Sequence, residues 1–347
     1  MRSRKYLRVA IVIAFLWSGQ SCLGTGLPAL RIFELVNQSD VVVVADVGEL
    51  KPIGPAGVMF GDTALLGERY RIEGLALYRL VGSCPDEFSV EFVLPNASTS
   101  YRSVKTGTRL LFLKKSGTTY NPTSLYFPDF PAVRSEPAEF QGLEGAELVF
   151  AELGAAIASS AASPEYKWEV LRQSFAIPAS NKLFLNDLLV GLQNTSDPDL
   201  HHRIQAELIS RNDLSQLPDV SGVLLSDTLS ETQKDLLLFT IGRDLKSERA
   251  LPALVRLLQS SDPKVRVAST QALWHTASPS SISIAALAQA LNDKNPEVRY
   301  YAIRGLADAT GEQQWGPGPA EYEAHEAKYR QHWLEWTTRN SAIRTNK

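Results

Sequence analysis

A histidine followed by a glutamate near the C-terminal end comes nearest to metal chemistry in this sequence. His325-Glu326 begins like a zinc-protease helix, in which a second histidine four residues after the first brings both imidazoles to one metal ion. Tyr329 stands in that second place, so no adequate ligand set remains. The sequence also holds no nucleophile elbow and no paired acid and base in a common motif. It therefore predicts no catalytic, cofactor-binding or metal-binding residues.

Cys22 follows a segment with the order of a secretory signal peptide. A basic stretch precedes an apolar run from Val9 to Trp17, and small or polar residues come next. Nine apolar residues are too few to cross a bilayer core, which needs about 20. We expect residues 1–21 to be a signal peptide, and the mature chain to begin at Cys22 outside the cytoplasmic membrane. Its location would be periplasmic, cell-envelope associated or secreted.

Each of the two cysteines has two interpretations. The residues before Cys22 partly match a bacterial lipoprotein signal, in which this cysteine would be acylated, whereas ordinary cleavage would leave it unmodified. Lipidation would give a membrane anchor, and otherwise only the signal peptide would contact a membrane. Cys84 would form a disulfide with Cys22 in an oxidising compartment, or be a small buried apolar residue.

Length and charge bound the class of protein. The chain has 347 residues, which favours two domains, and 44% of them are hydrophobic, which suffices for real cores. Lys and Arg total 35 against 38 Asp and Glu, for a net charge of -3. Because this balance provides no basic surface, nucleic acid is not an expected partner.

The first part of the chain has the pattern of a small β barrel. The valine-rich run at 41–47 is a strand candidate, since β-branched residues suit a pleated, buried surface. Alternating apolar residues predict further strands at 70–80 and 88–94, and another is expected at 109–115. The segment from Lys51 to Gly67 is rich in proline and glycine and is expected to be a long connection between strands, either a surface hairpin or a loop that carries a binding site. Residues 27–130 are thus predicted to form a barrel or sandwich.

The order of these features resembles the netrin-like inhibitors of metalloproteinases, whose barrel is of the oligonucleotide-fold (OB) type. The resemblance rests on Ser39-Asp40-Val41-Val42-Val43, on the strand ending near Leu80-Val81-Gly82, on Glu91-Phe92 and on the strand 107–113. In that family an N-terminal cysteine chelates the protease zinc. The resemblance implies this role for an unacylated Cys22, although the family's other cysteines are missing here.

A repeat of 33 residues marks the second part of the chain. Asp262-Pro263-Lys264-Val265-Arg266 recurs as Asn295-Pro296-Glu297-Val298-Arg299, with an older copy from Asp197 and a degenerate one around 231–241. Asp262 and Asn295 are suited to cap a helix, and the proline after each suits the first helical turn. Beyond the repeats, Tyr322, Tyr329, Trp333 and Trp336 follow at helical spacing and predict a capping helix.

This pattern resembles HEAT repeats over about 160 residues. The resemblance implies an all-α solenoid at 181–340 and a surface that binds a protein partner. The region at 131–180 is rich in proline, serine and alanine and is expected to connect the two parts and to contain helices. Asp262, Arg266, Asn295 and Arg299 are interpreted as repeat-stabilising residues rather than ligand contacts. The sequence as a whole predicts a multidomain, exported, non-catalytic scaffold. The alternatives are a metalloprotease inhibitor acting through the barrel and, third, an enzyme such as a lyase built on the array.

Overall fold

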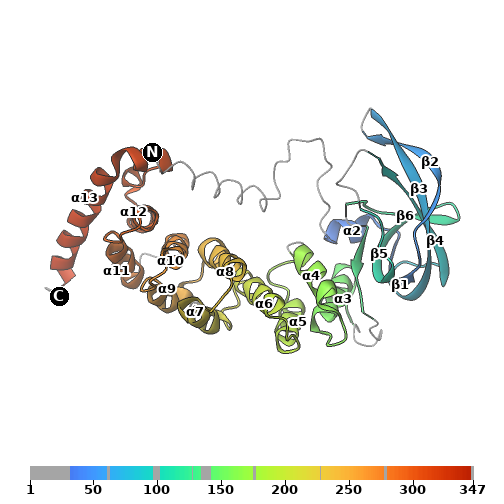
Figure 1. Ribbon diagram of the computed structural model, residues 1–347, viewed down its shortest axis with the longest axis horizontal. Coiled ribbons are helices and arrows are strands. Elements are labelled where there is room, and N and C mark those ends of the chain that lie inside the picture. Colours follow the sequence, from blue (N-terminus) through green and yellow to red (C-terminus); the bar gives the residue numbers. More distant parts are fainter. Residues whose placement is uncertain are drawn as a thin grey trace.

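The structure, a computed structural model, shows a β barrel at one end of an arc of helices (Figure 1). It describes residues 32–344, with gaps at 61–62, 97–101, 127, 134–141, 175–176, 227 and 277–279. The prediction of a β part followed by a helical repeat array is confirmed.

Five strands close the barrel. Strand β1 pairs with both β3 and β5, and β4 and β6 complete the ring, so the order is β1-β3-β4-β6-β5 and back to β1. Every pair in the ring is antiparallel except β4 with β6. The elements of this part are α2 (Ile32–Gln38), β1 (Val41–Val47), β2 (Lys51–Phe60), β3 (Thr63–Val81), β4 (Glu87–Pro95), β5 (Gly107–Ser116), β6 (Thr119–Pro122) and β7 (Asp129–Pro131).

Strand β1 is buried on both faces, which explains its unbroken run of valines. Val41 and Val43 lie in the barrel interior, with Ile72 and Val90 from the neighbouring strands. Val42 and Val44 point the other way, into a core shared with the helices. A strand in the middle of a barrel that also carries helices on its outside has no solvent face to fill with polar residues.

For Lys51–Gly67 the expected hairpin is confirmed, and the alternative of a loop is wrong. The segment forms β2 and the first part of β3, and these two strands pair with each other over their length. Strand β2 pairs with β3 alone, so it is an edge strand, where proline is tolerated because one row of backbone donors needs no partner. Proline and glycine therefore mark an edge here rather than a loop.

The helices form two rows along the arc. An inner row contains α4, α6, α8, α10 and α12, each in contact with the next, and Figure 1 places α8, α10 and α12 on the concave side. An outer row contains α3 and α5, then α7, α9 and α11. Their bounds are α3 (Ala146–Ala158), α4 (Pro164–Gln173), α5 (Lys182–Gln193), α6 (Pro198–Ser210), α7 (Leu217–Ser226), α8 (Glu231–Asp244), η3 (Glu248–Ala250), α9 (Leu251–Leu257), α10 (Pro263–Thr276), α11 (Ser281–Ala290), α12 (Pro296–Thr310), η4 (Gln313–Trp315) and α13 (Pro319–Arg344).

Side-chain caps begin the inner-row helices as the repeat predicts. The Asn295 side chain accepts hydrogen bonds from the backbone N–H groups of Glu297 and Val298, and Pro296 occupies the first turn of α12. Asp262 accepts from the Lys264 N–H at 2.8 Å in the same way. These caps satisfy donors that have no intrahelical partner, and so fix where each repeat helix starts.

One hydrophobic core joins the barrel to the start of the array. It contains Val42, Phe112 and Phe130 from the barrel, together with Val149 of α3 and Phe184 of α5. A second core begins in α6 and continues to α13. The helices of the connecting region, α3 and α4, thus extend the two rows and pack against the barrel.

This core leads to an expectation for fragments of the chain. An array fragment of residues 181–344 should be helical and melt cooperatively, but at a temperature roughly 5–10 °C below a fragment of residues 142–344. Phe184 and Leu188 are fully buried, and the shorter fragment removes the α3 surface that α5 packs against. Thermal melts followed by circular dichroism measure this difference. Equal melting temperatures would show that α3 contributes nothing to the array.

Candidate functional site

The residues predicted to stabilise the repeats link successive inner-row helices to the following turns. The Arg266 Nε and Nη2 groups donate to the Asp293 carboxylate at 2.7 and 3.0 Å, and its Nη1 group donates to the carbonyls of Ser260 and Ser261. One repeat earlier, the Lys234 ammonium donates to the Asp262 carboxylate at 3.0 Å. Asp262 therefore both caps α10 and accepts from α8.

Arg299 makes the same contacts one repeat later. Its Nε group donates to Glu326 of α13 at 2.5 Å, and its Nη1 group donates to the carbonyls of Asp293 and Lys294. The side chains of Arg266 and Arg299 are only 16% and 15% exposed. Most of their donors are used inside the array, which leaves little capacity for a ligand.

The aromatic residues of α13 cover the end of the array. Tyr322, Tyr329 and Trp333 are buried in the core that contains Val298 and Leu306. The Trp333 indole N–H donates to the Trp315 carbonyl at 3.1 Å. The long helix bends at His325, whose φ of -138° is not helical. These contacts place Tyr322, Tyr329 and Trp333 in the interior of the array.

A second group of aromatic side chains lies on the inner row and reaches solvent. We call Phe239, Arg243, Trp274, Tyr300, Tyr301 and Arg304 the inner-face cluster. In α10, Ala272 is buried and Ser269 donates to the Leu254 carbonyl of the outer-row helix α9. Trp274 comes two residues after Ala272, about 200° further around the helix, and so faces away from the outer row. The four aromatic residues of the cluster are half-buried.

Contacts within the inner-face cluster join α10 to α12, and a separate contact lies within α8. The Trp274 ring stacks on Tyr301 with centroids 5.7 Å apart, and the Arg304 guanidinium lies 5.0 Å from the Trp274 ring centre. The Trp274 indole N–H donates to Asp308. On α8, the Arg243 guanidinium lies 5.3 Å from the Phe239 ring. Trp, Tyr and Arg are the residue types that contribute most to binding energy at protein interfaces.

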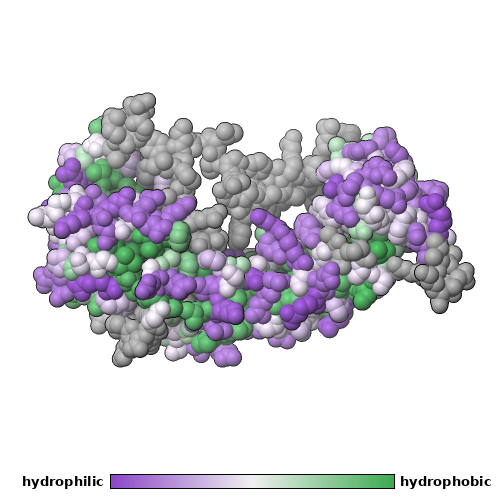
Figure 2. Space-filling view, turned by 180° about the vertical axis from the view of Figure 1, so that it is seen from behind, coloured by the Kyte–Doolittle hydropathy of each residue, from purple (hydrophilic) through white to green (hydrophobic). Residues whose placement is uncertain are grey.

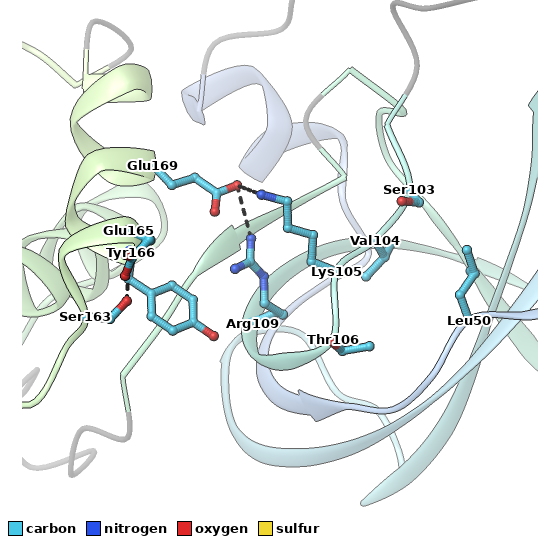
Figure 3. Close-up of a pocket in the computed structure, with 10 residues that line it drawn as sticks. All are labelled: Leu50, Ser103, Val104, Lys105, Thr106, Arg109, Ser163, Glu165, Tyr166 and Glu169. Carbon is cyan, nitrogen blue, oxygen red and sulfur yellow. Dashed lines mark hydrogen bonds and ion pairs between the residues drawn. The ribbon is translucent and has the colours of Figure 1, made fainter.

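A buried ion cluster lies where the barrel meets α4 (Figure 3). Arg109 of β5, only 1% exposed, donates through Nε to Asp129 of β7 and through Nη2 to Glu169 of α4 at 3.4 Å. The Lys105 ammonium donates to the same Glu169 oxygen at 2.8 Å. Burial alone would raise the pKa of Glu169, but Lys105 and Arg109 outweigh it and hold that pKa below its ordinary value.

The ion cluster borders an open cavity of about 460 Å³, which we call the junction cavity. Its lining comes from both parts of the chain, as Figure 3 shows. Gly107 allows this approach: it has a φ of +92°, and a side chain there would lie 3.1 Å from the Tyr166 hydroxyl. The barrel contributes Leu50, Ser103, Val104, Lys105, Thr106 and Arg109, and the start of α4 contributes Ser163, Glu165, Tyr166 and Glu169.

Asp187 of α5 is an acidic residue packed against a neighbouring helix. A side chain on Gly154 of α3 would lie within 2 Å of the Asp187 carboxylate, so the two helices are in direct contact there. Among the residues that the structure describes, this carboxylate has no hydrogen-bond partner. Burial raises the pKa of Asp187 to about 6.

The raised pKa of Asp187 gives the stability of the protein a pH dependence. Its folded-state pKa exceeds the unfolded value of about 3.9, so the folded state binds more protons between these values and stability falls as pH rises from 4 to 6. Asp187→Asn should therefore raise the free energy of unfolding at pH 7.5 by about 1–2 kcal/mol, a value reduced for partial solvent screening. At pH 4 the gain should vanish.

Chemical denaturation at both pH values checks this expectation, with Asp219→Asn as the control. Asp219 is exposed in the first turn of α7. A gain for Asp187→Asn that is the same at pH 4 and pH 7.5 would show that charge burial is not its cause.

The remaining candidates for chemistry are either apart from one another or outside the described residues. In the described ranges, no three histidine, cysteine or acidic residues gather as a metal site, and none of the helices there is long and apolar enough to span a membrane. His201 and His202 contact each other edge to face. Cys84 is half-buried in the middle of the connection between β3 and β4. Cys22 and the predicted signal peptide lie outside the described residues, so the inhibitor hypothesis has no described geometry.

Sequence reasoning missed both regions that the structure brings together. Arg109 and Asp129 are 20 residues apart, and Glu169 is 60 residues from Arg109, so no local motif connects them. Arg109 at the start of an apolar strand was the available signal, because a buried charge needs a partner. In the inner-face cluster, the signal was an aromatic residue on the face opposite the small core residues of each repeat.

Comparison with known proteins agrees with a helical repeat region. Residues 244–278 match the family model described as the Armadillo/beta-catenin-like repeat. The match spans η3, α9 and α10, about a tenth of the chain. Two or three helices per repeat are typical of HEAT and Armadillo units. No curated protein matches this chain. The chain thus contains a unit similar to an Armadillo repeat within a longer helical array that follows a β barrel.

Proposed function

We propose that this protein is a non-catalytic scaffold that binds a protein partner through the inner-face cluster. The observation that carries the proposal is the set of half-buried aromatic side chains, with Arg243 and Arg304, on the inner-row helices α8, α10 and α12, which Figure 1 places on the concave side. Armadillo-like repeats generally serve as protein-binding surfaces, which supports the same conclusion. Figure 2 shows one side of the arc, on which apolar patches lie among polar residues.

Site-specific photo-crosslinking in the native host tests this function. A photoreactive phenylalanine analogue at Phe239 should give a discrete crosslinked protein, because this residue is half-buried beside the exposed Arg243. The matched control is the same analogue at Ile282 of α11, which is 54% exposed on the outer row. The proposal requires the Phe239 adduct to be lost in an Arg243→Ala background. Equal labelling from both positions would contradict it.

We also propose that the scaffold is exported and that its mature form begins at Cys22. The order of basic, apolar and small residues before Cys22 supports this location. Mass spectrometry of the native protein should find no peptide containing residues 1–8. It should also distinguish a free Cys22 amine from an acylated one by the added mass of the lipid. Intact residues 1–8 on most of the protein would overturn the export proposal.

For the barrel we propose an OB-type assignment. The closed ring of five strands, with one parallel pair between β4 and β6, supports it. Fold type does not carry an activity. An experimental structure of residues 32–131 with the first helices of the array, compared strand by strand with known barrels, tests the assignment.

A further inference from the structure

We propose that the junction cavity binds a neutral, hydroxyl-rich small molecule, such as a sugar or a cyclitol. This inference does not depend on the inner-face cluster or on its partner. The cavity has a volume of about 460 Å³, which lies within the roughly 300–1,000 Å³ of small-molecule sites. It is bounded by the loop at 103–106 on the barrel and by the first turns of α4 (Figure 3).

Several polar groups around the cavity retain unused hydrogen-bonding capacity. In the part of the chain that the structure describes, the Ser103 and Thr106 hydroxyls have no hydrogen-bond partner. Arg109 uses Nε and Nη2 for its two carboxylate partners and has no such contact through Nη1 there. Lys105 uses its ammonium for Glu169 alone. The lining thus offers donors and acceptors that a single ligand can satisfy together.

The charges around the cavity favour a neutral ligand. Two cations, Arg109 and Lys105, already contact Asp129 and Glu169, and Glu165 adds a third carboxylate. An anion in the cavity would be repelled by these carboxylates. A cation would be repelled by Arg109 and Lys105, so either charge would weaken binding. A hydroxyl group donates and accepts without disturbing the ion pairs.

Two apolar surfaces complete the site. The Tyr166 ring extends toward Arg109, whose guanidinium lies 5.7 Å from its centre, and Leu50 lines the cavity on the barrel side. The C–H face of a sugar ring packs on an aromatic ring while its hydroxyl groups reach the polar groups beside it. Because the lining comes from both parts of the chain, a bound ligand should also raise the melting temperature of the whole protein.

Ligand-detected NMR with a matched panel tests the proposal on the full mature chain. The probes are glucose, N-acetylglucosamine and myo-inositol as neutral ligands, glucuronate as an anion and glucosamine as a cation. At least one neutral probe should show saturation transfer and should bind more tightly than glucuronate and glucosamine. The Ser103→Ala/Thr106→Val variant should weaken this binding about tenfold through the loss of two hydrogen bonds.

Thr232→Val is the control, because Thr232 is an exposed threonine on α8 away from the cavity. It should bind like the wild type, and circular dichroism should show both variants folded. No saturation transfer from any neutral probe at high-millimolar concentration would overturn the proposal. So would tighter binding of a charged probe, or an equal loss of binding in the control.

Discussion

Arg109→Met should lower the free energy of unfolding by about 3–5 kcal/mol. Arg109 is the cation between the buried carboxylates of Asp129 and Glu169, and its side chain is only 2% exposed. Methionine fills a similar volume but removes the positive charge beside the two buried carboxylates. Burial already raises the pKa of Asp129 against the effect of Arg109, so removing the guanidinium makes its ionised form costlier still.

The control for this variant is Arg71→Met in the same barrel. Arg71 pairs with Glu91 at 2.5 Å, but its side chain is 45% exposed. An exposed pair contributes about 1 kcal/mol or less, so this variant should be nearly as stable as the wild type. A further variant, Arg109→Met with Asp129→Leu and Glu169→Gln, should recover much of the lost stability, since the buried charges go together. Urea denaturation measures all three, and equal losses for the two single variants would contradict the argument.

Trp333→Ala should lower the free energy of unfolding by about 3–5 kcal/mol as well. Trp333 is fully buried, its indole N–H donates to the Trp315 carbonyl, and its ring meets Trp336 and His332 edge to face. Truncation removes the largest of the α13 side chains that are packed in the core of the last repeat. The exposed apolar end should then promote aggregation.

Trp336→Ala is the matched control, because Trp336 lies on the same helix but is only half-buried. It should cost clearly less stability than Trp333→Ala. Denaturation and light scattering provide the two readouts. If Trp333→Ala kept full stability while losing a bound partner, the aromatic residues of α13 would form a recognition surface and not a cap.

Local rules alone were enough to predict much of this fold. β-Branching predicted β1, and alternation predicted β4 and the second part of β3, because these signals depend on near neighbours in the chain. The Asp-Pro and Asn-Pro steps predicted where α6, α10 and α12 begin, since an N-cap and a proline act within one turn of helix. The repeat period predicted a solenoid, because each unit can bury its apolar face only against the next.

Tertiary structure decided which of these residues meet. A proline- and glycine-rich stretch became strand β2, because an edge strand needs only one row of backbone hydrogen bonds. Arg109 pairs with Asp129 of β7 and Glu169 of α4, and residues from both parts of the chain line the junction cavity. Contacts of this kind depend on how the barrel closes and how α3 and α4 pack on it. Residue spacing along the chain does not encode them, because they join segments whose separation in sequence has no relation to their separation in space.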